Sequence, residues 1–293
     1  RDLVRSRGLG DVYKRQPLAV SSCQKTSIRQ TLEKAGENRR ELETVLEHYK
    51  NEPLKEKAAR FLLENMDGHF AHTGEAVDVY DNYMDSVFRH CNGDRVFWIM
   101  KYDTILQRTG LDLELSQDER LYDAQSVTAD FLTEHIDSAF TVWQQNWNKQ
   151  YSFEMFCRYV LPYRIGNEKT SLWRKTFTVP SWVREAYAPN QDNSTYAYGM
   201  ANDILGGMRS VIYYPPQFLP DLPLTALEHV KSASCKEYAH LCVAVLRAHG
   251  LPATIDFTPQ WGNRGLGHEW CVFFSDNHSF IPFNPGERLG DHF

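Results

Sequence analysis

The sequence of 293 residues lacks any apolar run approaching the 18 residues that a membrane-spanning helix needs. It also lacks a basic surface, because the formal net charge is −6 and no stripe of Lys and Arg alternates with aromatic residues. Its six cysteines are scattered and form no CxxC pair, which argues against a zinc knuckle or a small disulfide scaffold. The composition, 42% hydrophobic and 24% charged, is that of a globular protein with one large domain or two smaller ones and no nucleic-acid partner.

The first sixteen residues, RDLVRSRGLGDVYKRQ, resemble the translated adapter sequence found at the ends of assembled metagenomic genes. We therefore interpret residues 1–16 as an artefact and leave them out of the fold prediction. They carry a net charge of +3, so the remaining chain has a formal charge of −9.

Residues 17–25 contain PLAVSSC, in which Val20-Ser21-Ser22-Cys23 resembles a bacterial lipobox. The resemblance implies that this stretch is the remnant of a lipoprotein signal and that Cys23 receives the lipid. The protein would then sit at the bacterial cell envelope and meet the membrane only through that anchor. The alternative is a chance run of small residues near a truncated end.

Residues 26–165 read as a helical region with few Gly or Pro and no clear strand alternation. Periodicity predicts helices at 26–50, 53–66, 75–91, 95–108 and 152–160, and two more across 117–148 that divide near residue 125. Gly36 weakens the middle of the first helix. We expect this region to form an all-α layer.

The pattern changes after about residue 165, where proline and aromatic residues become frequent. Residues 166–194 are interpreted as a connection, and helices are predicted at 196–206 and 234–249. Strands are predicted at 253–259, 268–274 and 278–283, the last two joined by a turn at 275–277. The predicted fold class is α+β, with the helical N-terminal region packed on a core of residues 195–293 that contains a short antiparallel sheet.

Cys235 stands at the start of the helix predicted for residues 234–249, ahead of its apolar stripe. A helix N-terminus has unpaired N–H groups and a positive dipole end, which favour the nucleophilic thiolate. The alternative interpretation is a small buried hydrophobic residue. Cys242 and Cys271 lie within apolar periodicity and are predicted to be core residues, while Cys91 and Cys157 are expected to be unbridged.

His268 begins one predicted strand and Asn284 follows the next, so a hairpin between them would bring the two side chains together. If the helix of Cys235 packs on this sheet, its N-terminus can meet His268. We expect the Cys235 sulfur to lie within about 4–5 Å of a ring nitrogen of His268. Asp276, on the hairpin turn, is the alternative third member if Asn284 is misplaced.

The phrases CKEYAHLCVAVLRAHGLPA, GHEW and IPFNP resemble, in this order, the transglutaminase-like family of the papain-type fold. FLLENMDGHF, VLPYRIGNE and YYPPQ further upstream resemble Bacteroidales lipoproteins that carry this domain. The resemblance implies a transglutaminase-like core in which Cys235 attacks an amide carbonyl, His268 transfers the proton and Asn284 orients the imidazole. The family usually has Asp at the last position.

For the oxyanion, the resemblance implies the backbone N–H of Cys235 and one further donor, for which Gln217, Tyr213 and Tyr214 are candidates. No cofactor and no metal are expected, because a site of Cys235, His240 and His268 would lack a fourth ligand. His240 and His249 read as surface or helix-end residues. Tyr163, Arg164 and Trp173 are expected to pack between the helical region and the core rather than to bind substrate.

The function predicted first is an envelope-anchored thiol enzyme that acts on amide bonds of a peptide or protein, by hydrolysis or acyl transfer. The second is an inactive module that binds peptide or glycan-linked material in the same groove, and the third a structural helical lipoprotein with a fortuitous triad. The chain stops nine residues after Asn284, at Phe293, so we expect a C-terminal truncation. The sequence predicts neither the substrate nor the oligomeric state.

Overall fold

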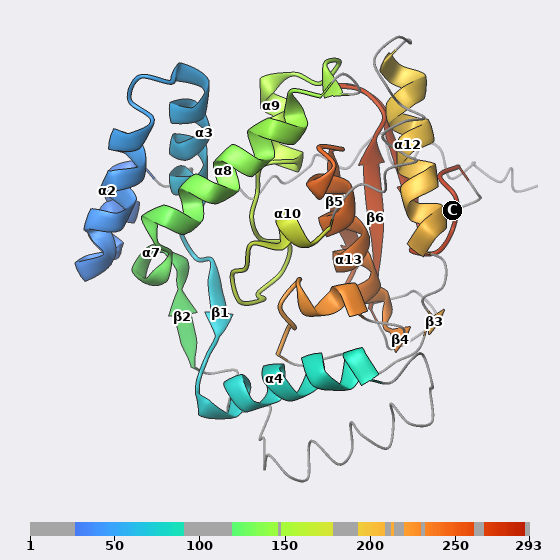
Figure 1. Ribbon diagram of the computed structural model, residues 1–293, viewed down its shortest axis with the longest axis horizontal. Coiled ribbons are helices and arrows are strands. Elements are labelled where there is room, and N and C mark those ends of the chain that lie inside the picture. Colours follow the sequence, from blue (N-terminus) through green and yellow to red (C-terminus); the bar gives the residue numbers. More distant parts are fainter. Residues whose placement is uncertain are drawn as a thin grey trace, which may run out of the picture.

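The computed structural model describes residues 27–90, 119–145, 148–177, 193–208, 212–213, 220–229, 232–260 and 267–290. Within these residues the fold is α+β, as predicted, with helices packed against a small antiparallel sheet (Figure 1). The predicted helix at 95–108, the lipobox with Cys23, and Cys91 lie outside the described residues.

The N-terminal region begins with α1 (Ile28–Lys34), η2 (Gly36–Asn38), α2 (Arg39–His48) and α3 (Pro53–Glu64). The single helix predicted for 26–50 is thus divided in two. Gly36 has a φ of 57°, in the left-handed region that glycine adopts without strain, and there the chain changes direction. The second of these helices, α2, buries Leu42 and Val45 against α3 and α8 (Ala129–Trp143).

A small sheet interrupts the region that was predicted to be all-helical. β1 (Phe70–His72) pairs antiparallel with β2 (Arg120–Tyr122), and α7 (Asp123–Ser126) follows directly. The predicted helix across residues 117–125 is therefore wrong over 120–122. Three-residue strands are too short to show an alternating pattern, so the local sequence could not predict this pairing.

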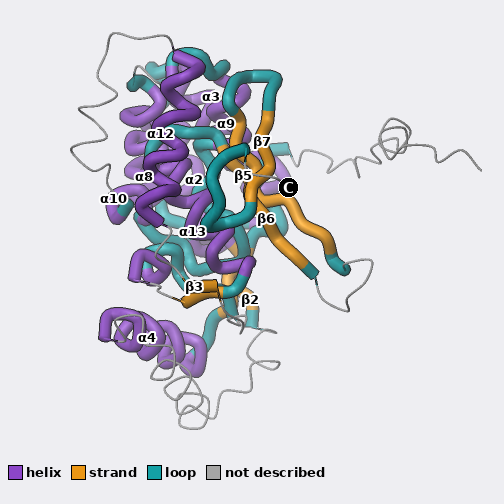
Figure 2. Tube along the Cα trace, turned by 90° about the vertical axis from the view of Figure 1, so that its right-hand side faces the viewer, coloured by secondary structure: helices purple, strands orange, loops and turns teal. Residues whose placement is uncertain are grey.

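The other described helices are α4 (Glu75–His90), α9 (Phe153–Tyr159), α10 (Trp173–Thr176), α12 (Asn193–Met208), η4 (Ala226–His229) and α13 (Cys235–Ala248). They gather on one side of the larger sheet, as the turned view shows (Figure 2). Across the described ranges, no helix has both the length and the apolar character that crossing a bilayer requires.

The larger sheet has the order β5 (Ala253–Thr258), β6 (His268–Phe274), β7 (Phe280–Phe283), with both pairs antiparallel. All three strands were predicted from sequence. Helix α13 packs on β5 and β6, and the sulfur of Cys271 on β6 donates a hydrogen bond of 3.6 Å to the carbonyl of Ala239. Cys242 and Cys271 are both fully buried free thiols, as predicted. Cys157 is also an unbridged, buried thiol.

A second, two-stranded pairing leads the chain into α13. β3 (Ile212–Tyr213) runs parallel to β4 (Ser232–Ala233), with Tyr213 opposite Ala233. This pairing was not predicted, and it lies two residues before Cys235.

Gly250 ends α13 with a φ of 76°, and a Cβ there would lie 2.2 Å from Nδ2 of Asn148. Gly36 has a similar φ but nothing within 4 Å of such a Cβ. We predict that Gly36→Ala lowers the free energy of unfolding by about 1 kcal/mol, from backbone strain alone. Gly250→Ala should lower it by about 2–3 kcal/mol, because Asn148 must also move. Urea unfolding followed by circular dichroism measures both; equal losses would contradict the packing at Gly250.

Candidate active site

Cys235 is the first residue of α13, and Ser234 is the N-cap. The carboxylate of Glu237 accepts hydrogen bonds from the backbone N–H of Ser234, at 3.1 Å, and from its hydroxyl. This contact closes the first turn and fixes the backbone on either side of the cysteine. Cys235 is a free thiol that is only partly buried, unlike Cys242 and Cys271. Among these three cysteines on α13 and β6, Cys235 is therefore the one that a reagent can reach in the folded protein.

His268 and Asn284 are brought together by the hairpin of β6 and β7, as the sequence predicted. The ring nitrogen Nε2 of His268 lies 3.1 Å from Oδ1 of Asn284. Nδ2 of Asn284 donates to a carboxylate oxygen of Glu287 at 3.3 Å, which orients the amide so that its oxygen faces the histidine. Because an amide oxygen only accepts, Nε2 of His268 is the donor in this contact.

The first turn of α13 also lies beside the segment that follows Asn284. Tyr238 is one turn after Cys235 on the same helix face. A Cβ on Gly286 would lie 3.4 Å from the ring of Tyr238, so the chain just beyond Asn284 packs against this face. The segment that follows Asn284 thus lies against the face of α13 that also carries Cys235.

The distance predicted between Cys235 and His268 stays a prediction. No hydrogen bond joins the Cys235 sulfur to the His268 ring in the part of the chain that the structure describes. Along β6, Glu269 and Cys271 face α13, with contacts to His240 and Ala239, while His268 stacks near Trp270 with ring centroids 6.0 Å apart. Because successive side chains of a strand point to opposite faces, His268 and Trp270 lie on the face of β6 opposite to Glu269 and Cys271.

Of the predicted oxyanion candidates, Tyr213 lies in β3 and its backbone pairs with that of Ala233, close to Cys235. Tyr214 and Gln217 lie outside the described residues.

A cavity of about 370 Å³ flanks α13 beside Cys235. The residues that directly follow the cysteine and the histidine, Lys236 and Glu269, both line it. The rest of the lining is supplied by the loop after α9, the segment before η4, α13 and β5, namely Ile165, Gly166, Asn167, Asp221, His240, Arg247, Thr254, Ile255 and Phe257. The cavity is mainly polar and charged.

Three residues that are far apart in the sequence meet at this cavity. Potential ligand atoms of Glu168, Asp221 and His240 all lie within 4.8 Å of one another. His240 was predicted to be a surface residue, but it is only 6% exposed, and its Nε2 forms an ion pair of 3.5 Å with Glu269. His249, predicted likewise, is also buried, with Nδ1 2.6 Å from the carbonyl of Val245.

Nearby opposite charges shift the pKa values of His240 and Asp221 in this cluster. Burial alone would lower the pKa of His240, but the neighbouring carboxylates of Glu269, Asp221 and Glu168 raise that pKa above its usual value. Burial acts in the opposite sense on Asp221, whose pKa is nevertheless held below its usual value, chiefly by Lys236 and His240. The surrounding charges therefore favour the charged form of both His240 and Asp221.

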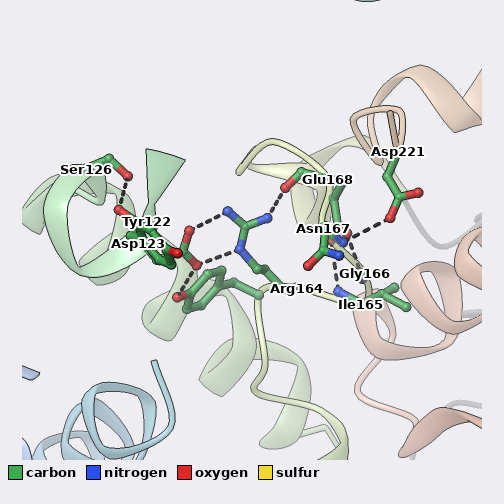
Figure 3. Close-up of polar contacts among 10 residues, drawn as sticks. Tyr122, Asp123, Ser126, Arg164, Ile165, Gly166, Asn167, Glu168 and Asp221 are labelled. Atoms are coloured by element: carbon green, nitrogen blue, oxygen red, sulfur yellow. Dashed lines mark hydrogen bonds and ion pairs between the residues drawn. The ribbon is translucent and has the colours of Figure 1, made fainter. Parts of the chain in front are cut away.

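Arg164 fixes the loop that carries Glu168 (Figure 3). Its guanidinium binds the carboxylate of Asp123 through two nitrogens and donates to the carbonyl of Glu168. Both members of the ion pair are almost completely buried. The Glu168 carboxylate accepts from the N–H groups of Ile165 and Gly166, at 2.9 and 2.7 Å.

Two aromatic residues complete this junction between the helical region and the loop. Tyr163 donates its hydroxyl to Asp123 at 2.8 Å, and Trp173 donates Nε1 to the carbonyl of Tyr163 at 2.8 Å. Tyr163, Arg164 and Trp173 are all buried, which agrees with the packing role predicted for them.

We predict that Arg164→Met lowers the free energy of unfolding by about 3–5 kcal/mol, because it leaves the Asp123 carboxylate buried without its ion partner. The matched control is Arg29→Met, which removes an exposed pair with Glu33 and should cost less than about 1 kcal/mol. Chemical unfolding of both variants tests this, and a loss at Arg164 as small as that at Arg29 would contradict the role of the buried pair.

Comparison with known proteins finds one family profile that matches part of the chain. Residues 180–285 match the sequence profile of the transglutaminase-like superfamily. A crystal structure of a "Putative Cysteine Protease" from Cytophaga hutchinsonii is 16% identical over 41% of this chain and 40% of its own, with a TM-score of 0.29. A superposition as loose as this carries no argument about the site. No curated protein matches the sequence significantly.

Proposed function

We propose that the transglutaminase-like domain of residues 180–285 is a thiol enzyme that cleaves or transfers amide bonds, with Cys235 as the nucleophile, His268 as the base and Asn284 as the residue that orients it. The observation that carries the proposal is the 3.1 Å hydrogen bond between His268 and Asn284, together with the place of Cys235 as the first residue of α13. A histidine held by an amide and a cysteine at a helix N-terminus are the parts that thiol acyl transfer needs.

In the reaction, Nδ1 of His268 takes the thiol proton, and the thiolate sulfur of Cys235 forms a bond to the amide carbon of the substrate. The carbon–nitrogen bond then breaks, and the leaving amine takes the proton from the imidazolium. The thioester that remains is attacked by water, which completes hydrolysis, or by an amine, which completes transfer. The backbone N–H of Cys235 stabilises the oxyanion at the helix N-terminus.

A peptide or protein is the substrate class that we propose, because the partly exposed thiol lies at an open helix end beside a charged cavity. The alternative function is a module that binds the same material without cleaving it. The two differ in the chemistry of Cys235, so thiol reactivity distinguishes them.

The first test is the rate at which iodoacetamide alkylates Cys235 at different pH values. If His268 takes the thiol proton, the rate should reach half its maximum well below pH ~8.5, the value of an ordinary thiol. Asn284→Asp should move this midpoint lower still, because a carboxylate stabilises the imidazolium more than an amide does.

Asn65→Asp, at the exposed end of α3, is the control and should leave the midpoint unchanged. A midpoint near 8.5 in the wild type that does not respond to Asn284→Asp would favour the binding module over the enzyme.

We further propose that the protein is anchored at the bacterial cell envelope by a lipid on Cys23. The support is the lipobox-like Val20-Ser21-Ser22-Cys23. Expression from the complete gene with a fatty-acid analogue should label the wild type and leave Cys23→Ala unlabelled. Equal labelling of the two proteins would contradict the lipid anchor on Cys23. It would not bear on the thiol chemistry proposed for Cys235.

A further inference from the structure

We propose that Glu168, Asp221 and His240, together with Glu269, form a binding site for one divalent transition-metal ion of the Mn²⁺ type. The site lies at the cavity beside α13 and uses neither Cys235 nor His268, so it is independent of the proposed function. It would join the loop after α9, the segment before η4 and β6 to the helix that begins with Cys235.

The first support is the convergence of donor atoms. Those of Glu168, Asp221 and His240 lie within 4.8 Å of one another, and Glu269 approaches Nε2 of His240 to 3.5 Å. Metal–ligand bonds of about 2.0–2.2 Å place the donors of one ion about 3–4.4 Å apart, so Glu168, Asp221 and His240 need only small side-chain rotations. Glu269 lies outside this group of three and would turn from His240 towards the ion. The set of three carboxylates and one imidazole suits Mn²⁺, since oxygen donors dominate and the imidazole favours a transition metal.

The second support is the space and backbone around these donors. Gly166 has no side chain, and a Cβ there would lie 2.5 Å from Cε1 of His240 and 2.7 Å from Oδ2 of Asp221. Glycine at this position therefore lets the three side chains converge. The cavity of about 370 Å³ opens on Asp221, His240 and Glu269 and gives an ion a route from solvent.

The third support is that the carboxylates are already held in place. Glu168 accepts from the N–H groups of Ile165 and Gly166, and Asp221 accepts from that of Asn167 at 3.0 Å. Each oxygen has a second lone pair, so these contacts leave room for a metal and act as the outer shell that orients ligands. Figure 3 shows the three N–H groups on consecutive residues of one loop.

Two cations border the site and differ in their effect. Arg247 donates to the carbonyls of Ala253 and Arg164, at 3.0 and 3.1 Å, and so is engaged with neutral groups. Lys236 forms an ion pair with Oδ1 of Asp221, and a metal ion must compete with it as well as with the proton that His240 shares with Glu269. Removing the charge of Lys236 should therefore strengthen metal binding. A gain in affinity is a useful test because a misfolded variant would not show it.

The experiment is a titration of the metal-free protein with Mn²⁺, in which electron paramagnetic resonance measures the free ion. The wild type should bind one equivalent saturably. Asp221→Asn should weaken binding at least tenfold, and Lys236→Met should strengthen it about tenfold, because one unit of positive charge is lost beside the ligand. Mn²⁺ is chosen because it has little affinity for thiolates, so Cys235 does not compete.

Lys34→Met is the matched control, since Lys34 also pairs with an aspartate, Asp67, at 2.7 Å but far from the cluster, and it should leave the affinity unchanged. Absence of saturable binding by the wild type would overturn the proposal. So would a Lys236→Met protein that melts cooperatively yet binds no more tightly than the wild type, since the ion would then lie elsewhere.

Discussion

Helix α13 is buried along almost its whole length, and the arrangement around it follows from that burial. Every residue from Glu237 to Ala248 is buried, so its polar side chains must find partners inside the protein. Arg247 reaches two carbonyls, His240 reaches Glu269, and Glu237 turns back to the N-cap. These partners fix the loop after α9 and the start of β6 against the helix.

Cys235 and Lys236, at the first turn, are the residues of this helix that stay partly exposed. The same end is where a helix has unpaired N–H groups and a positive dipole. The burial of the rest of the helix therefore leaves its first turn, with Cys235 and Lys236, as the part of α13 that solvent can reach. The hairpin of β6 and β7 holds His268 and Asn284 together as a hydrogen-bonded pair, and the chain just beyond Asn284 packs against Tyr238, one turn after Cys235.

The parts of this arrangement that sequence could predict depend on local patterns. The apolar spacing after Cys235 predicts α13, and the alternation on both sides of a Ser-Asp-Asn turn predicts β6 and β7. Because a hairpin fixes which strand ends meet, the contact between His268 and Asn284 followed from those strands alone. The family resemblance, from the same phrases, agrees with the profile match over residues 180–285.

The parts that sequence could not predict depend on contacts between distant segments. β1 and β2 are three residues each and are separated by almost fifty residues, so neither carries a pattern of its own. Glu168, Asp221 and His240 come from two loops and a helix, and His240 read as a surface residue because its carboxylate partners lie outside the helix. The distance between His268 and Cys235 depends on how β6 packs beside the start of α13, which no sequence pattern specifies.

The most direct test of the central claim is intact and peptide mass spectrometry after incubation with a peptide that carries an acyloxymethyl ketone. The account predicts one adduct per chain, located on Cys235, and loss of that adduct in a His268→Ala protein whose thermal unfolding matches the wild type. Adducts spread over several cysteines, or equal labelling of Cys235 with and without His268, would contradict the claim that these two residues act together.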